Sequence, residues 1–363
     1  MADLFTGLLN VEDKEEMKNK LSSLYNVSSI FDFNFGRSAI QIALKSLNLN
    51  RGDEVILSTY SCRGVIEPII KEGLIPVFVD IDSNYNINPE SIKKHLTNKT
   101  RVVIMTHLFG RPAQIEKIQK IVKKHKLYLI DDAAQVVGLK HKNKMVGTFG
   151  DFGILSFGIG KSISATGGGI LLTNNEEFAK RIIHYWILKG DENKKIKRRI
   201  INYLLKYKHR RLTAPFYLLI GRLGKPLEYE IKRMSLVDCS IIKKQLSRLD
   251  GIIEERKKIA EYYDKHLKNV RKGNSEDIYT KYLFVSKENN IHEFADYLRL
   301  KGIEVEFNYK PLHLNSQYSI YWRDRLSNAE NMWEKNISIP CHPRVNARKM
   351  KYVVDTINNY NHG

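Results

Sequence analysis

The sequence predicts an α/β fold: a mainly parallel central sheet with helices on both faces, followed by a small C-terminal α+β domain. From about residue 30 to residue 185, short apolar runs of strand length alternate with stretches of helical periodicity. These runs are apolar almost throughout, as expected for strands that are covered on both faces of a parallel sheet. Beyond residue 235 long helical stretches predominate, which indicates a second unit.

The expected strands are separated by enough residues to include a helix each time. They are Glu54–Leu57, Pro76–Val79, Val102–Thr106, Leu127–Ile130, Gly153–Phe157 and Ile170–Thr173. Helical periodicity lies between them, most clearly in Ser38–Leu47 and Ile115–His125. Ligands of such sheets bind beyond the carboxyl ends of the strands, so functional residues are expected in the loops that follow these runs.

Two domains are expected, a large one over residues 1–250 and a small one over residues 251–363. Leu236–Leu267 has the pattern of one or two long helices at the junction. In the small domain, Tyr279–Val285 and Ile303–Phe307 are the expected strands. The large domain also contains a basic, apolar insertion at about residues 189–228.

Composition indicates a globular protein without a metal site. The 363 residues are 42% hydrophobic, which suits a packed core. No apolar run approaches the ~18 residues of a membrane-spanning helix, and no secretory signal is evident, so we expect a cytoplasmic protein. Cys62, Cys239 and Cys341 stand far apart, as reduced thiols do. No cluster of His, Cys and Asp has the spacing of metal ligands.

Much of the positive charge lies in the insertion. The whole chain has a formal charge of +20, and the stretch from Lys189 to Lys225 has twelve Lys or Arg residues against two acidic ones. Basic clusters interleaved with Leu, Ile, Tyr and Phe are typical of interfacial helices on anionic membranes. A peripheral membrane contact and an insertion that packs on the protein's own dimer both remain open. Nucleic acid is not expected, because no recognition motif accompanies the charge.

A lysine and a carboxylate follow two of the expected strands. Asp132 follows the run Leu127–Ile130, and Lys161 follows Gly153–Phe157 and precedes the triple glycine Gly167–Gly169. An enzyme that uses pyridoxal 5'-phosphate (PLP) needs this pair, because the amine forms a Schiff base and the carboxylate keeps the pyridine nitrogen protonated. A lone lysine is usually a solvated surface residue, so the pairing carries the inference.

A candidate phosphate site precedes the helix at Ile40–Leu47. Gly36, Arg37 and Ser38 offer backbone amides at a helix start, close approach at the glycine and a hydroxyl, all of which suit a phosphate anion. Ser156, shortly before Lys161, is a second candidate ligand. Both features have a plainer interpretation, since Gly-x-Ser is often only a helix cap and Ser156 also suits a buried strand.

In order along the chain, these residues resemble the DegT/StrS-type sugar-nucleotide aminotransferases, which are fold type I PLP transferases. The resemblance runs from about Phe35 to Ile182 and again from Arg233 to the C-terminus. The stretches that carry it are Gly36–Ala39, Gly52–Ile56, Pro76–Asp82, His107–Pro112, Ile130–Gln135, Gly150–Asp151, Ser156–Phe157, Lys161, Gly167–Gly169, Pro311–His313 and Ile339–Pro343.

The resemblance implies roles for individual residues. Lys161 and Asp132 would be catalytic, with Asp132 on the pyridine nitrogen, and Gln135 would bind the cofactor's 3-hydroxyl. The positions that match the family's phosphate ligands are Gly36, Arg37, Ser38 and Ser156. L-Glutamate would supply the amino group, and a keto-sugar on a nucleoside diphosphate would accept it, for polysaccharide or glycosylated-metabolite biosynthesis. Lys161 in place of the histidine of sugar-dehydrating relatives favours transamination. A homodimer is also implied.

Two departures from the family pattern affect the site. Cys62 stands where relatives have an aromatic ring stacked on the cofactor, so Tyr60 takes that role or the ring is absent. Ile231 stands where relatives have an asparagine that reaches the partner's phosphate, although Arg233 nearby is kept as a candidate substrate ligand.

His107 and His313 lie in matching motifs and are candidate substrate ligands, with a structural role as the alternative. Two further functions stay open: a transaminase with another, membrane-presented carbonyl acceptor, and a non-catalytic PLP-binding regulatory or scaffold relative.

Overall fold

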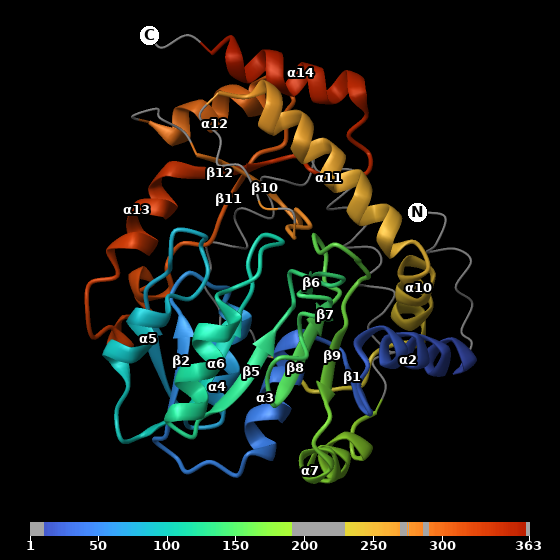
Figure 1. Ribbon diagram of the computed structural model, residues 1–363, viewed down its shortest axis with the longest axis vertical. Helices are drawn as coiled ribbons and strands as arrows, with labels where there is room; N and C mark the ends of the chain where they lie inside the picture. Colours follow the sequence, from blue (N-terminus) through green and yellow to red (C-terminus); the bar gives the residue numbers. More distant parts are fainter. Residues whose placement is uncertain (1–10, 191–228, 269–273, 275, 286–289, 361–363) are drawn as a thin grey trace.

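The computed structural model describes residues 11–190, 229–268, 274, 276–285 and 290–360. A seven-stranded sheet in the order β1-β9-β8-β5-β4-β2-β3 forms its centre (Figure 1). The strands are β1 (Ser29–Phe33), β2 (Glu54–Ser58), β3 (Ile75–Val79), β4 (Thr100–Thr106), β5 (Tyr128–Asp132), β8 (Phe152–Ser156) and β9 (Gly169–Thr173). From β3 to β8 all neighbours are parallel, whereas β9 is antiparallel to both β8 and β1. The predicted mainly parallel sheet is confirmed.

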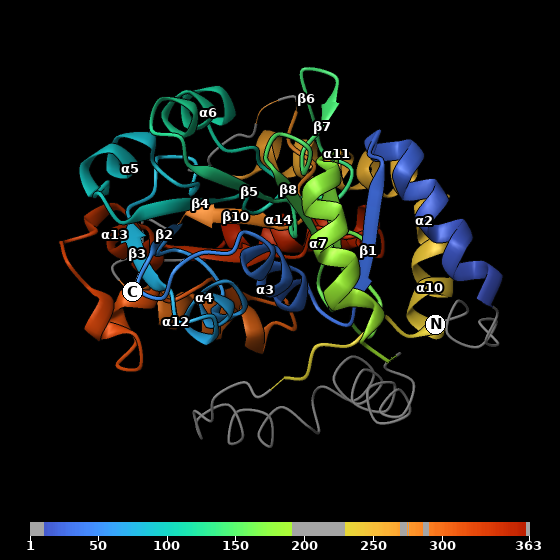
Figure 2. The same cartoon turned by 90° about the horizontal axis from the view of Figure 1, so that it is seen from below.

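Helices cover both faces of this sheet (Figure 2). One face packs against α2 (Val11–Tyr25), α5 (Pro89–His95), α6 (Ile115–Lys124) and α10 (Leu236–Leu246). The other packs against α3 (Gly36–Ser46), α4 (Arg63–Lys71) and α7 (Glu176–Ile187). Val103 of β4 lies in the first core and its neighbours Val102 and Ile104 in the second, because successive side chains of a strand alternate between faces. Because both faces of these strands are buried, nearly every residue in their sequences is apolar.

A smaller antiparallel sheet follows α11 (Leu249–His266). It has the order β10 (Tyr282–Val285), β12 (Asn336–Ile339), β11 (Glu306–Phe307), and α12 (Ile291–Leu300) and α14 (Ala347–Asn358) pack with it. The connection from β11 to β12 contains the short helices η1 (Leu312–Leu314) and η2 (Ser319–Tyr321) and then α13 (Ser327–Lys335). The expected α+β character is confirmed, while the boundary between residues 250 and 251 stays a prediction.

Five elements differ from expectation. Strand β1 was not expected, because Asp32 interrupts its apolar run; this carboxylate is fully buried and pairs with Lys14 at 2.9 Å and Lys18 at 3.2 Å, both on α2. Strand β12 and the hairpin of β6 (Lys140–His141) and β7 (Lys144–Met145) were also missed, being short and partly polar. Helix α3 begins at Gly36, earlier than expected.

Residues 229–234 return to the end of β1. The Asn34 amide donates to Lys232 O at 2.8 Å, and the Arg233 amide donates to Gly190 O at 3.0 Å. Apart from residues 189 and 190, the predicted insertion lies outside the described residues, and so does its predicted membrane contact. In the part of the chain that is described, no helix combines the length and apolarity of a membrane span.

Candidate active site

Two adjacent strands of the large sheet bring Asp132 and Lys161 to one edge. Asp132 is the last residue of β5 and pairs in register with Ile154 of β8. Lys161 follows β8 through a glycine turn, in which Gly160 has φ +89° and the Lys161 amide donates to Gly158 O at 3.3 Å. Asp132 therefore lies at the carboxyl end of one parallel strand and Lys161 beyond the carboxyl end of its neighbour, the edge at which ligands of such sheets bind.

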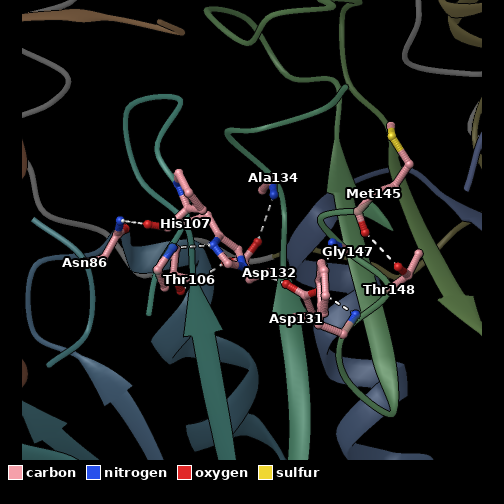
Figure 3. A network of polar contacts seen from close by, with 12 residues as sticks. Asn86, Thr106, His107, Asp131, Asp132, Ala134, Met145, Gly147 and Thr148 are labelled. Atoms are coloured by element: carbon pink, nitrogen blue, oxygen red, sulfur yellow. Dashed lines mark hydrogen bonds and ion pairs between the residues drawn. The ribbon is translucent and has the colours of Figure 1, made fainter. Parts of the chain in front are cut away.

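The Asp132 carboxylate is held by neighbouring donors (Figure 3). Thr106 Oγ1 donates to Oδ2 at 3.2 Å and the Ala134 amide donates to Oδ1 at 3.1 Å. Burial raises the pKa of Asp132, against the effect of these bonds and of the Lys161 charge. A cationic N–H group bound beside Asp132 would offset the cost of keeping this buried carboxylate charged.

Burial has the opposite effect on the amine of Lys161. It lowers the pKa of Lys161, although the charges of Cys62 and Asp132 act against the shift. A lowered pKa increases the fraction of neutral amine, which is the nucleophilic form. Asp132 and Lys161 thus form a buried acid–amine pair suited to covalent chemistry with a carbonyl compound.

Asp131, next to Asp132, has a structural environment (Figure 3). It accepts hydrogen bonds from the Gly147 amide at 2.8 Å, the Phe149 amide at 2.9 Å and His107 Nε2 at 2.7 Å. His107 Nδ1 in turn accepts from the Ala113 amide at 2.8 Å. Both ring nitrogens of His107 are engaged and the side chain is fully buried, so its geometry favours the structural alternative over substrate binding.

The start of α3 lies against Ser156 at the end of β8. A Cβ at Gly36 would stand 3.1 Å from Ser156 Cβ and 3.3 Å from its Oγ, so glycine permits this close approach. Phe35, the N-cap residue, supplies no side-chain hydrogen bond to the helix. Within the described residues Ser156 Oγ has no hydrogen-bond partner. The helix start and this hydroxyl together form a candidate anion site.

The side chains of the two residues after Gly36 are engaged elsewhere. Ser38 Oγ donates to Asn34 Oδ1 at 2.8 Å and is fully buried. The Arg37 guanidinium lies over the Phe35 ring at 5.0 Å and 3.7 Å from Glu67. Their predicted phosphate contacts therefore depend on backbone amides rather than on these side chains.

Tyr60 and Cys62 occupy different environments. The Tyr60 ring is fully buried among Tyr85, Phe109 and Tyr309, with centroids 6.2 to 6.3 Å away. This position does not favour the predicted stacking role, because the ring has no accessible face. Cys62 is half-buried at the start of α4. Burial raises the pKa of its thiol against the charge of Lys161, which places Cys62 beside the acid–amine pair.

Gln135 connects the site to two residues that sequence reasoning missed. Its Nε2 donates to Tyr309 OH at 3.0 Å, and its backbone oxygen accepts a hydrogen bond from Thr280 Oγ1. Thr280 Oγ1 also lies 3.1 Å from the hydroxyl of Ser162, the neighbour of Lys161. Tyr309 stands just before the motif Pro311–His313, and this proximity could have indicated Tyr309 as a site residue. No comparable sequence feature accompanies Thr280.

His313 and Arg233 make contacts of other kinds. His313 Nδ1 lies 2.6 Å from Thr59 Oγ1 and Nε2 lies 3.1 Å from Glu330 Oε1, in a buried setting that resembles that of His107. The Arg233 guanidinium lies over the Trp186 ring of α7 at 5.1 Å. Neither set of contacts includes Lys161. Among the described residues, no set of three His, Cys, Asp or Glu side chains is arranged to hold a metal ion.

Comparison with known proteins identifies the family. The model of the DegT/DnrJ/EryC1/StrS aminotransferase family matches residues 8–358. The chain belongs to this family. Aminotransferases of the DegT/DnrJ/EryC1/StrS family depend on PLP, so the predicted class of enzyme and its cofactor are confirmed.

Individual members of the family match most of the chain. A GDP-perosamine synthase of Escherichia coli O157:H7 is 27% identical over 353 residues, covering 95% of this chain and 89% of the relative. A dTDP-3-amino-3,6-dideoxy-alpha-D-galactopyranose transaminase of Aneurinibacillus thermoaerophilus is 27% identical over 354 residues, with 95% and 89% covered. A crystal structure of a DegT DnrJ EryC1 StrS aminotransferase from Brucella abortus superposes with a TM-score of 0.78 at 24% identity, covering 97% of this chain and 90% of that one. This likeness confirms the predicted fold.

The described residues fit the cofactor of this family. Lys161 offers an amine, and Asp132 offers a carboxylate whose burial favours a cationic partner. Gly36, which lets the start of α3 approach Ser156 closely, and the hydroxyl of Ser156 suit a phosphate at the start of this helix. The side-chain amide of Gln135, three residues after Asp132, lies between the Phe109 amide and the Tyr309 hydroxyl.

Proposed function

We propose that this aminotransferase moves an amino group from L-glutamate to a nucleotide-linked keto-sugar, in polysaccharide or glycosylated-metabolite biosynthesis. The names of the two relatives support this substrate class, since both refer to nucleotide-linked amino sugars. They differ in the nucleotide, GDP in one and dTDP in the other, so the proposal extends to the class and not to one base. The basic character of the chain suits a diphosphate substrate.

Each site residue would have a definite part in the reaction. PLP supplies an electron sink that makes the proton beside the amino group labile. Lys161 would bind the cofactor covalently and then carry the proton between the substrate carbon and the cofactor. Asp132 would hold the proton on the ring nitrogen, and Gln135 would bind the 3-hydroxyl. The phosphate would lie at Gly36 and Ser156.

The buried pair of Lys161 and Asp132 is the observation that carries the proposal. A lysine with a lowered pKa would leave the cofactor as a neutral amine when the amino group of the donor takes its place, as transamination requires. We propose that the enzyme acts as a homodimer in the cytoplasm.

A membrane-presented acceptor is the alternative function. A variant that lacks residues 194–225 tests this alternative by liposome co-sedimentation. Binding by the intact protein that the variant has lost would support a membrane-presented acceptor, whereas absence of binding by the intact protein at low and high salt would exclude it.

Absorbance spectroscopy tests the first half of the reaction. The protein is reconstituted with PLP and its visible spectrum is recorded before and after L-glutamate, with Lys161→Ala in parallel. We expect a band that requires Lys161 and that glutamate converts to the pyridoxamine form. A band that glutamate leaves unchanged would contradict the donor, and absence of any Lys161-dependent band would contradict the whole assignment. A panel of GDP-, dTDP- and UDP-linked keto-sugars would then identify the acceptor.

A further inference from the structure

The side-chain amide of Gln135 has a defined orientation. The Phe109 amide donates to Gln135 Oε1 at 3.2 Å, so the oxygen of the side chain faces Phe109. Phe109 has φ +59°, a left-handed conformation that an aromatic residue rarely adopts. Its ring is buried, edge-on to Tyr85 at 5.6 Å and to Tyr60 at 6.2 Å, and this packing holds the unusual turn in place.

The other end of the amide faces Tyr309. Gln135 Nε2 lies 3.0 Å from Tyr309 OH, and because an amide NH₂ group only donates, the phenolic oxygen is the acceptor. The hydroxyl proton must then point elsewhere. Within the described residues Tyr309 OH makes no other hydrogen bond. The Tyr309 side chain is half-buried, so part of it is accessible.

Tyr309 also lies close to the acid–amine pair. Burial raises the pKa of its hydroxyl well above the ordinary value, and the neighbouring Cys62 and Asp132 raise it further. The protonated hydroxyl, which can donate a hydrogen bond, is therefore favoured. The ring packs edge-on against Tyr60 at 6.3 Å, which limits its movement.

We propose that Tyr309 is a further binding residue of the site. Its hydroxyl oxygen accepts a hydrogen bond from the Gln135 amide. Its hydroxyl proton is donated to the same ligand oxygen that Gln135 binds. This inference rests on the proposed function, in which that atom is the 3-hydroxyl oxygen of PLP. Two donors on one oxygen withdraw negative charge from it. The nitrogen that links the cofactor to Lys161 then holds its proton less tightly, because the oxygen beside it is less negative.

The variant Tyr309→Phe tests the proposal, because it removes the hydroxyl and keeps the ring that packs on Tyr60. The measured quantity is the pH at which the visible band of the lysine-bound cofactor is half-converted. We expect this midpoint to rise by about one pH unit, the size expected for loss of a hydrogen bond to a charged oxygen. Tyr85→Phe is the matched control: it removes a hydroxyl from the same aromatic cluster without touching Gln135, and its midpoint should equal that of the wild type.

A second variant tests the contact between Tyr309 and Gln135. In the variant Gln135→Met the Tyr309 hydroxyl no longer has the Gln135 amide as its partner. Tyr309→Phe should therefore shift the midpoint less in this variant than in the wild-type protein. Equal shifts in both backgrounds would overturn the holding role, and an unchanged midpoint in Tyr309→Phe alone would overturn the proton donation. A wild-type protein that forms no Lys161-dependent band would instead overturn the proposed function, which separates the two failures.

Discussion

Replacing Gly169 by alanine should displace the start of α3 and weaken cofactor binding. Gly169 begins β9, and a Cβ on it would lie 2.3 Å from the carbonyl carbon of Phe35 and 2.4 Å from the amide nitrogen of Gly36. These are backbone atoms next to the candidate phosphate site, so no side-chain rotation relieves the clash. The segment Phe35–Gly36 must move away from residue 169.

The energetic cost follows from this geometry. An extra methyl group in a well-packed core costs about 1–3 kcal/mol when neighbours can adjust, and rigid backbone neighbours favour the upper value. Gly251→Ala is the matched control, because Gly251 is exposed on α11 and a Cβ there would meet nothing within 4 Å. In an exposed helix the same change stabilises a protein by about 0.5–1 kcal/mol.

Urea unfolding followed by circular dichroism measures the stability of both variants, and absorbance titration with PLP measures their cofactor affinity. We expect Gly169→Ala to unfold at lower urea and to bind PLP more weakly, while Gly251→Ala unfolds at slightly higher urea and binds PLP as the wild type does. A Gly169→Ala protein with wild-type stability and affinity would refute the reasoning that this contact positions the phosphate site.

Three further predictions concern single side chains. Asp132→Asn removes a carboxylate whose raised pKa makes its charge costly at pH 7, so the cofactor-free protein should unfold at no lower urea while transaminase activity falls by at least about 100-fold. Burial opposes the charge of His141, but hydrogen bonds to Glu276 and Glu116 outweigh it and raise the pKa of His141. The stabilisation from these bonds is complete below the pKa of His141 in the unfolded chain and is lost as the pH rises through its pKa in the folded protein. His141→Gln should therefore destabilise the protein by at most about 1 kcal/mol at pH 6 and not at pH 9. Urea unfolding at both pH values measures this difference. Arg256→Met should lower the free energy of unfolding by about 3 kcal/mol, because buried Nη1 donates to three backbone carbonyl oxygens that would lose their partner.

The large sheet and the Lys161–Asp132 pair were predictable because both depend on local patterns. Apolar runs separated by helices imply parallel strands, and parallel strands end at one edge, so two residues that follow adjacent runs meet. Strand β1 was not predictable from its run, since the buried Asp32 is stabilised by Lys14 and Lys18 on another element.

Contacts between distant segments could not be read from the sequence. Tyr309 lies 174 residues from Gln135, and Thr280 lies 145 residues from it. Nothing in the local pattern around Thr280 indicates its approach to Gln135. The motif Pro311–His313 points to the neighbourhood of Tyr309 but does not identify Gln135 as its partner. For the same reason the sequence could not decide between Tyr60 and Cys62, because burial of the Tyr60 ring depends on Tyr85, Phe109 and Tyr309, which three separate segments supply.

The hydrogen bond between the Arg233 amide and Gly190 O joins the two flanks of the basic stretch at residues 191–228. The two ends of this stretch are therefore held next to each other, beside β1 and α7. For a chain with its ends held together, the entropic cost of closure rises by only about 0.6 kcal/mol for each doubling of length. Such a joint allows the length of the stretch to change at little entropic cost while the chain on both sides stays anchored beside the sheet.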